Sequence, residues 1–177
     1  MYKKITLIVL LFSWIFLYWC GNNWWFQYDF DNFYGEFNTE NDFELSKAEL
    51  NWLWYNLIKN DIIKIYEQKN PEWFTESIII SKKNSDKDLE SYTKENIENV
   101  DISWLKITKG KNIQIECNDE TFDLMYFQWK YDMNQYNIYT TNWFLKVWQW
   151  IYTISYATLD EKSRNDFSSS FKTIKCK

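Results

Sequence analysis

The longest strand-like stretch of the sequence is Gln135-Tyr-Asn-Ile-Tyr-Thr-Thr-Asn-Trp-Phe-Leu-Lys-Val-Trp-Gln-Trp-Ile-Tyr-Thr-Ile-Ser-Tyr-Ala157. It is rich in β-branched and aromatic residues, which favour strands. We predict strands over residues 135–141, 144–147 and 151–157, with turns at residues 142–143 and 148–150. Strands joined by turns this short are antiparallel neighbours, so the stretch predicts the centre of an antiparallel sheet.

The rest of the chain adds strands and two helices to this centre. Further strand-like runs cover residues 62–68, 74–82, 112–116 and 123–128. A start similar to a capping box at Ser85 opens a helix that reaches about Val100, and a capping box at Thr158 opens a closing helix. Residues 42–59 fit either a helix or short strands. The pattern as a whole predicts an α+β fold.

Two segments carry a resemblance to a known family. Leu89-Glu-Ser-Tyr-Thr-Lys-Glu-Asn-Ile97 lies in the first predicted helix, and Ile151-Tyr-Thr-Ile-Ser-Tyr-Ala-Thr158 precedes a helix that ends Phe167-Ser-Ser-Ser-Phe-Lys-Thr-Ile174. With the strands between them, they resemble the small bacterial lipoproteins of the PsbP/Mog1-like superfamily over residues 60–177. The resemblance implies an antiparallel β-sheet flanked by helices on both faces, an α/β/α sandwich. It also implies a protein that binds or assists other proteins.

Tryptophan and glycine occur in unusual numbers. The chain has 12 Trp and only 3 Gly, whereas an average protein contains about 7% Gly. Trp73, Trp143, Trp148 and Trp150 all stand at predicted turns, where the turn chemistry favours glycine. We therefore hypothesise that most Trp residues are glycines encoded by UGA, and we expect these four side chains to lie exposed at or beside turns. The alternative is genuine Trp that lines a glycan-binding or membrane-facing surface.

The first residues resemble an export signal. A Lys3-Lys4 pair precedes an apolar run over residues 5–19, which is shorter than the roughly 20 residues of a membrane-spanning helix and typical of a signal peptide. Leu17-Tyr-Trp-Cys20 is similar to a bacterial lipobox, and glycine at position 19 would supply the small residue that a lipobox needs. The alternatives are an uncleaved anchor and an ordinary signal peptide.

These features divide the chain into three parts. We predict a signal peptide over residues 1–19, a flexible tether over residues 20–41 that follows a lipidated Cys20, and a single α+β domain over residues 42–177. The tether is predicted because its aromatic, Asn-rich and acidic residues show no sustained period. The lipid would hold the protein on the outer face of the cytoplasmic membrane or in the cell envelope.

Two cysteines remain once Cys20 carries lipid. Disulfides persist outside the cytoplasm, and Cys117 and Cys176 are the only other Cys residues of the chain. Cys117 ends a predicted strand and Cys176 follows the last predicted helix, so a helix packed over the sheet could bring them together. The pair predicts one disulfide, and the alternative is two unrelated thiols.

Charge and residue content exclude several classes of function. Cleavage after residue 19 removes Lys3 and Lys4 and leaves 18 basic and 25 acidic residues, a net charge of −7, which argues against nucleic acid as a partner. The chain has no His, so it lacks a Ser–His nucleophile and the commonest metal ligand. The sequence nominates no catalytic residues, no metal site and no cofactor site.

Three functions remain open. The leader, the resemblance and the missing catalytic residues favour a non-enzymatic cell-envelope lipoprotein that binds or scaffolds another envelope component. The alternative is a solute- or glycan-binding lipoprotein that uses exposed aromatic residues, which would need an aromatic-lined pocket with convergent polar groups. A hydrolase built on carboxylates would need two facing acids at a defined spacing, and the sequence nominates no such pair.

Overall fold

The computed structural model describes residues 24–39, 41–46, 62–69, 71, 74–100, 106–110, 112–133 and 136–177. The predicted signal peptide, Cys20, most of the ambiguous segment 42–59 and Trp73 lie outside the described residues. In the part that the structure describes, no helix is long and apolar enough to span a membrane.

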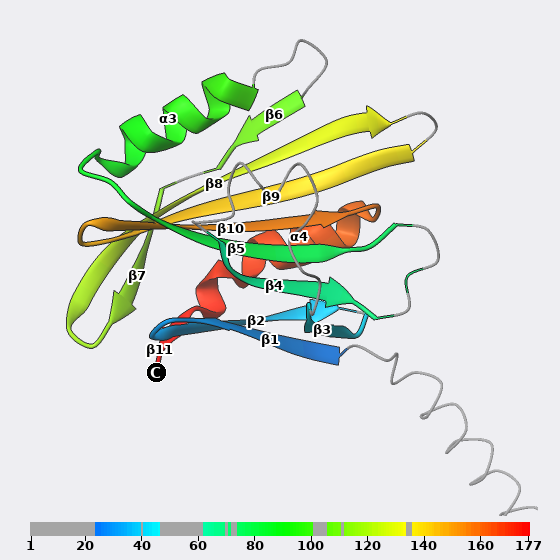
Figure 1. Cartoon of the computed structure of the whole chain (residues 1–177), viewed down its shortest axis with the longest axis horizontal. Helices are drawn as coiled ribbons and strands as arrows, with labels where there is room; N and C mark the ends of the chain where they lie inside the picture. The colour runs from blue at the N-terminus through cyan, green and yellow to red at the C-terminus, as the bar shows by residue number, and fades with distance from the viewer. Residues whose placement is uncertain are drawn as a thin grey trace, which may run out of the picture.

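Antiparallel strands make up most of the described chain (Figure 1). The elements in chain order are β1 (Trp24–Phe30), β2 (Phe33–Thr39), β3 (Phe43–Leu45), β4 (Ile62–Gln68), β5 (Ser77–Asn84), α3 (Leu89–Val100), β6 (Lys106–Lys109), β7 (Ile113–Cys117), β8 (Glu120–Met133), β9 (Tyr136–Val147), β10 (Trp150–Thr158), α4 (Glu161–Ser169), the 3-10 helix η1 (Ser170–Thr173) and β11 (Lys175–Cys176).

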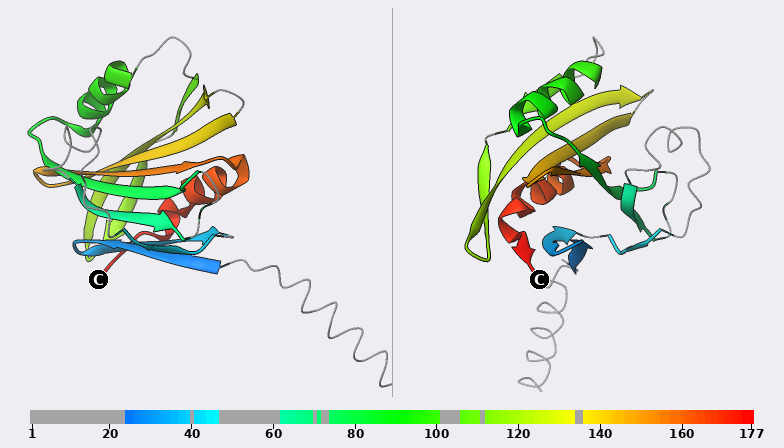
Figure 2. Two further views of the ribbon diagram at one scale, coloured as in Figure 1. Left: turned by 45° about the vertical axis from the view of Figure 1, so that its right-hand side comes forward. Right: turned by 60° about the vertical axis from the view of Figure 1, so that its left-hand side comes forward.

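The strands form two antiparallel sheets. The large sheet has the strand order β3-β4-β5-β10-β9-β8-β6, and β7 pairs with the first part of the long strand β8. The small sheet has the order β1-β2-β11. Figure 2 shows the small sheet lying against one face of the large sheet, and α4 contacts β2, β9 and β10.

The main core lies between the two sheets. Side chains alternate along each strand, so Tyr152 and Ile154 of β10 face the small sheet whereas Ile151 faces the opposite way. The small sheet contributes aromatic rings that are almost completely buried, among them Tyr28, Phe30 and Phe37. Burial of these large apolar side chains is the main stabilising term of the contact between the sheets.

A second, smaller core lies on the opposite face of the large sheet, under α3. This helix packs through Leu89 and Tyr92 against apolar side chains of β8 and β9. Asp88 caps its N-terminus, because its carboxylate accepts hydrogen bonds from the backbone N–H and the hydroxyl of Ser91. The helix that the sequence predicts up to about Val100 is confirmed.

The predicted α/β/α sandwich is wrong. Strands make up 61% of the described residues, and the α-helices are two short ones of 12 and 9 residues. The layer that closes the main core is largely the small β-sheet rather than a layer of helices. The described part of the chain is mostly β, because the hairpin of β1 and β2 occupies much of the sheet face that helices were expected to cover.

The predicted tether is wrong wherever the structure describes it. Residues 24–39 form the β1–β2 hairpin, whose register runs from Trp24 opposite Thr39 to Phe30 opposite Phe33. Buried and half-buried side chains alternate along the whole of β2, which is the period of a half-buried strand. The hairpin belongs to the domain, because its rings fill the main core.

The predicted turn at Asn142-Trp143 is also wrong. Strand β9 runs through this pair without a break, and Trp143 lies opposite Ile154 of β10. The Trp143 side chain is 0% exposed and stacks on Phe167 of α4, with ring centroids 4.6 Å apart. Burial of the indole under α4 outweighs the turn preference of the preceding Asn.

The predicted turn after Val147 is confirmed. Trp148 and Gln149 form a two-residue turn, and Val147 pairs with Trp150. Trp148 is 66% exposed, as expected for a turn residue. Trp150 is half-buried at the first position of β10 rather than mostly exposed.

Candidate functional site

Three two-residue turns lie at one end of the molecule, which we call the hairpin end (Figure 1, left). They are Asp31-Asn32 between β1 and β2, Asn118-Asp119 between β7 and β8, and Trp148-Gln149 between β9 and β10. Every positive φ of a non-glycine residue in the described chain falls in these turns, at Asp31, Asn118, Asp119 and Trp148. Backbone strain is thus concentrated at this end.

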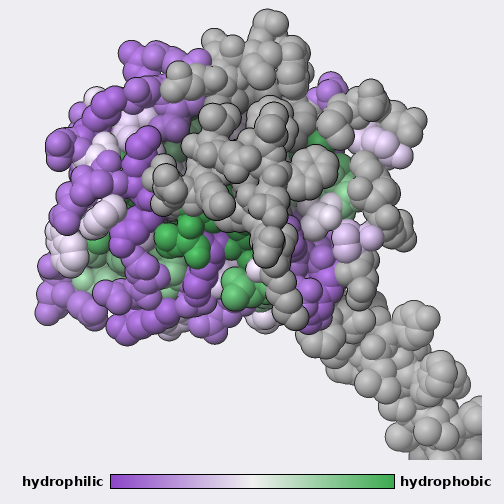
Figure 3. All heavy atoms as spheres, in the orientation of Figure 1, coloured by the Kyte–Doolittle hydropathy of each residue, from purple (hydrophilic) through white to green (hydrophobic). Residues whose placement is uncertain are grey.

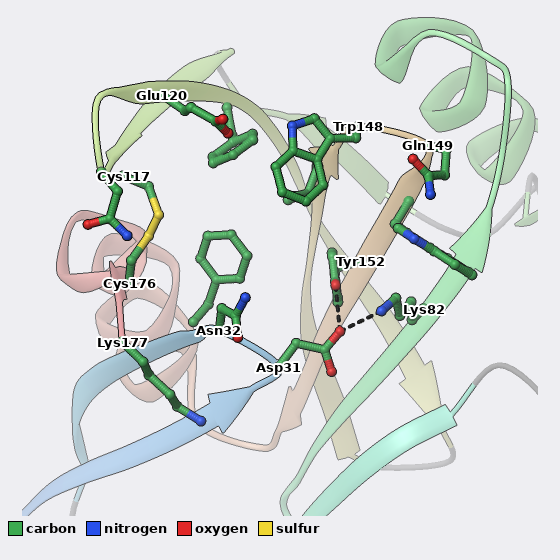
Figure 4. A pocket seen from close by; sticks show the side chains of 15 residues that line it. Asp31, Asn32, Lys82, Cys117, Glu120, Trp148, Gln149, Tyr152, Cys176 and Lys177 are labelled. Atoms are coloured by element: carbon green, nitrogen blue, oxygen red, sulfur yellow. Dashed lines mark hydrogen bonds and ion pairs between the residues drawn. A yellow bond between two sulfur atoms is a disulfide. The ribbon is translucent and has the colours of Figure 1, made fainter.

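A hollow of about 410 Å³ lies between these turns, and we call it the cleft (Figure 4). Its apolar lining is Phe33, Phe122, Val147, Trp148, Trp150 and Tyr152, and its polar lining is Asp31, Asn32, Lys82, Asn118, Glu120, Gln149 and Lys177. The described surface at the hairpin end is mostly hydrophilic in the view of Figure 3. Small-molecule sites have volumes of about 300–1,000 Å³, so the cleft is large enough for a small ligand.

An ion pair forms one wall of the cleft. Lys82 Nζ of β5 lies 2.6 Å from Asp31 Oδ2, and Tyr152 OH donates a hydrogen bond of 2.6 Å to the same oxygen (Figure 4). The Lys82 ammonium also lies 4.5 Å from the centroid of the Trp150 ring, which is a favourable cation–π distance. Both charges of the pair are therefore satisfied within the wall.

These contacts set the protonation states of the wall. Burial opposes the charge of Asp31, but hydrogen bonds from Lys82 and Tyr152 outweigh it and lower the pKa of Asp31. Burial, together with the hydrogen bond to Asp31, raises the pKa of Tyr152, and the hydrogen bond to Asp31 raises the pKa of Lys82. Near neutral pH the wall holds a carboxylate, an ammonium and a neutral phenol.

Lys177, on the C-terminal side of the cleft, likewise has its ammonium group paired with a carboxylate. Its Nζ lies 2.7 Å from Asp29 Oδ2, while Lys64 Nζ lies 2.6 Å from Asp29 Oδ1. Hydrogen bonds from Lys177 and Lys64 lower the pKa of Asp29 well below its usual range. Neither Lys82 nor Lys177 therefore offers an unpaired positive charge to a ligand.

Four polar side chains on the rim of the cleft have no hydrogen-bond or ionic partner among the described residues. They are the amides of Asn32, Asn118 and Gln149 and the carboxylate of Glu120, and all four are exposed. An amide group supplies two hydrogen-bond donors and one acceptor oxygen. The rim therefore presents three neutral amides, which can bind both hydroxyl and carbonyl groups of a ligand, and one carboxylate, which can accept hydrogen bonds from hydroxyl groups.

A disulfide closes the side of the cleft beside β11. Cys117 at the end of β7 is bonded to Cys176 of β11, with Cα atoms 5.7 Å apart, which lies within the range for a disulfide. Next to it, the Lys177 backbone N–H donates a 2.7 Å hydrogen bond to the Asn32 carbonyl. The structure thus joins the two predicted cysteines, and the bridge ties the small sheet to the large one at the cleft.

Glu76 is a buried carboxylate that sequence reasoning missed. Its side chain is 7% exposed and accepts hydrogen bonds of 2.7 Å from Tyr156 OH and from Thr158 Oγ1. It does not line the cleft, so its contacts stabilise the fold. Within the described ranges, no group of three His, Cys, Asp or Glu side chains is placed to hold a metal ion.

Most cleft residues were not predicted from the sequence, because they come from segments far apart in the chain. The two cysteines were paired as a hypothesis, and Trp148 and Trp150 were singled out only as turn residues. Asp31-Asn32 and Asn118-Asp119 are pairs that tolerate positive φ, and this signal could have placed two of the turns. Cys20, the predicted lipidation site, lies outside the described residues.

No family model and no curated protein matches the chain. Among solved structures, the chain is similar to cyanobacterial PsbP from Synechocystis sp. PCC 6803, with a TM-score of 0.48, 10% identity, and coverage of 86% of this chain and 92% of that chain. It is also similar to a Pseudomonas aeruginosa protein of unknown function described as a putative regulator, with a TM-score of 0.43, 11% identity, and coverage of 84% and 94%. A PsbP protein is thus among its structural neighbours. Because both TM-scores are below 0.5, neither neighbour indicates a function for this chain.

Proposed function

We propose that this protein is a non-enzymatic cell-envelope lipoprotein that binds a small, uncharged, hydroxyl-rich solute such as a sugar in the cleft. One observation carries the proposal: three amides that have no partner among the described residues surround an aromatic lining. An apolar pocket with a few convergent polar groups is the usual form of a small-molecule site. This feature favours the solute- or glycan-binding alternative over a protein that only scaffolds an envelope component.

The charges of the cleft support an uncharged ligand. Lys82 and Lys177 are paired with Asp31 and Asp29 at 2.6 and 2.7 Å, so an anion would have to displace an existing partner. Glu120 is unpaired in the described chain and would repel an anion at close range. The remaining free groups are amides, which bind neutral hydroxyl groups without a charge to desolvate.

A titration followed by nuclear magnetic resonance tests the binding proposal. Unlabelled N-acetylglucosamine and its short oligomers are added to the 15N-labelled protein, and we expect backbone shifts confined to the turns at residues 31–32, 118–119 and 148–149. The N32A variant should bind about fivefold to tenfold more weakly, because one or two hydrogen bonds are lost. The matched control is N137A, which removes an exposed amide outside the cleft. If neither these nor other neutral sugars shift the turns, the scaffold alternative replaces this proposal.

We also propose that Cys20 carries the lipid anchor. The Lys3-Lys4 pair, the short apolar run and the segment before Cys20 support this. Expression in a host that processes lipoproteins, from a gene with position 19 as glycine, should yield a chain that begins at an acylated Cys20, measured by mass spectrometry. The C20S variant should be released from the membrane fraction. Cleavage at another residue, or an intact N-terminus, would contradict the anchor.

For the tryptophans, we propose that UGA encodes glycine at least at positions 19 and 148. Trp148 has φ 53°, and Gln149 has no positive φ, which is the pattern of a type II′ turn with its preference for glycine at the first central position. Trp143 gives no such support, because it lies buried in a strand. The codon at position 148 tests this proposal: UGA is expected, and UGG would end the glycine interpretation.

A further inference from the structure

A second hollow lies directly beside the cleft. It has a volume of about 630 Å³ and is lined by Asp86, Asp88, Leu89, Glu120, Thr121, Phe122, Asp123, Lys146 and Trp148. Three of these residues, Glu120, Phe122 and Trp148, also line the cleft. The two hollows are therefore neighbours that share one boundary.

The Trp148 side chain is the largest part of this boundary. It stands edge-on to the Phe122 ring, with centroids 6.2 Å apart, and it is 66% exposed. Figure 4 shows its indole on the opposite side of the cleft from Asp31. The backbone at Trp148 has φ 53°, where a side chain is unfavourable and glycine is not. Glycine at this position would remove the largest of the three shared side chains while the turn keeps its shape.

We propose that residue 148 sets the length of the ligand: with glycine there, the two hollows form one trough that takes an extended, uncharged oligosaccharide, whereas Trp148 restricts the cleft to short ligands. This inference rests on the proposed binding of neutral sugars. The combined trough runs from the Asp31–Lys82 wall, past Phe122, to Asp123 and Lys146.

The second hollow selects against anionic ligands. Four carboxylates line it, from Asp86, Asp88, Glu120 and Asp123. Its one ammonium group, on Lys146, donates to the backbone carbonyls of Ser85 and Lys87. Four carboxylates and one ammonium leave a net negative charge, so an anionic oligosaccharide would be repelled in this half of the trough. An uncharged oligosaccharide can accept and donate hydrogen bonds there without repulsion.

Two measurements on W148G test the inference. A crystal structure of W148G without ligand should show one continuous hollow from Asp31 to Asp123. Calorimetric titration with N-acetylglucosamine oligomers, from monomer to hexamer, should show affinity rising about tenfold between dimer and tetramer in W148G, and by roughly threefold or less with Trp148 present. Oligogalacturonate of the same lengths should bind W148G more weakly. The matched control is W25G, which removes another exposed Trp, outside both hollows, and should keep the length dependence of the unmodified chain.

Two results would overturn the inference. In the first, the Phe122 or Glu120 side chain fills the vacated space, and the crystal structure shows two separate hollows. In the second, W148G and the Trp148 protein bind the oligomers with the same dependence on length. If neither protein binds any sugar, the proposed function fails, and the crystal structure still decides whether residue 148 divides the trough.

Discussion

Trp143 and Trp148 place the same side chain in two opposite environments on one hairpin. Trp143 lies inside β9, is 0% exposed, and stacks on Phe167 of α4 with ring planes 13° apart. Trp148 lies in the turn that follows β9, is 66% exposed, and has φ 53°. Trp143 contributes buried apolar area to the core. Trp148 contributes backbone strain and part of the boundary between the two hollows.

The difference separates the part of the molecule that stabilises it from the part that can bind. The main core is built from closely packed aromatic rings, such as Phe37, Tyr156 and Phe167. The hairpin end instead combines positive φ angles, exposed amides and ion pairs around a hollow. Strain and unpaired polar groups of this kind lower stability and are typical of functional sites.

The largest effect is expected from W143G. Truncation of a buried Trp costs about 3–5 kcal/mol, and glycine within a strand adds roughly 0.5–1 kcal/mol. For a domain of this size, a loss of about 4 kcal/mol lowers the Tm by roughly 10 °C or more. Thermal unfolding measures the change in Tm, and urea unfolding measures the change in unfolding free energy. W25G, at a strand position where the Trp is 67% exposed, is the control and should cost only about 1 kcal/mol. Unchanged stability of W143G would mean that position 143 also suits glycine.

The second-largest loss of stability is expected when the disulfide at the hairpin end is removed. Cys117 and Cys176 are 59 residues apart in the sequence, and closure of such a loop stabilises by about 4 kcal/mol in the chain-entropy model, less any native-state strain. The C117S/C176S double variant should therefore unfold at a clearly lower urea concentration than the oxidised protein. Reduction of the unmodified protein should reproduce this shift. If the double variant and the oxidised protein unfold together, the bridge does not constrain the chain.

A smaller loss of stability is expected when the pH is lowered. The pKa values of Asp29 and Asp31 are lowered in the folded protein, so their contribution to stability is complete above the unfolded value of about 3.9 and is lost as the pH falls below it. Both side chains are more than a third exposed, at 36% and 38%, so solvent screening limits each pair to about 1 kcal/mol or less.

The D29N/D31N variant sharpens this prediction. Its unfolding free energy should change less between pH 7 and pH 3 than that of the unmodified protein, measured by urea unfolding at both values. Protonation of Asp31 also frees the Lys82 ammonium, so small anions should bind the cleft better at acid pH. An identical pH dependence of stability in both proteins would show that these pairs contribute nothing.

The smallest effect on stability is expected from W148G. Relief of the left-handed backbone is worth about 1–2 kcal/mol, and the entropy of glycine in the unfolded chain and the lost contact with Phe122 offset part of it. We expect stability to be unchanged or raised by about 1 kcal/mol, in contrast to the loss in W143G. A loss of more than about 1 kcal/mol, measured by urea unfolding, would show that Trp148 is a structural residue.

The centre of the fold could be predicted from local patterns. The β9–β10 hairpin and α3 have clear strand and helix periods, and both are found near the predicted positions. The β1–β2 hairpin was missed because it is short and aromatic, and its burial depends on the large sheet that it covers. The prediction of a turn at Asn142-Trp143 was wrong because packing of Trp143 against Phe167 outweighs a local turn preference.

The site could be predicted only in fragments. The Cys117–Cys176 pair followed from counting cysteines, and the structure joins them. The Asp31–Lys82 pair could not be foreseen, because it links a turn to β5 across 51 residues and depends on how the two sheets pack. Asn32, Asn118 and Gln149 are ordinary turn residues in the sequence, and they become a set only when three hairpins end together.

The most direct test of a binding site at the hairpin end compares binding with stability in one variant, N32A/N118G/Q149A, in which position 118 takes glycine because Asn118 has φ 49°. These three amides are exposed and unpaired among the described residues, so their removal should leave the Tm within about 2 °C of the unmodified protein. The same variant should bind N-acetylglucosamine oligomers at least about tenfold more weakly in calorimetric titration. Unchanged affinity in a fully folded variant would contradict the claim that the hairpin end is a binding site.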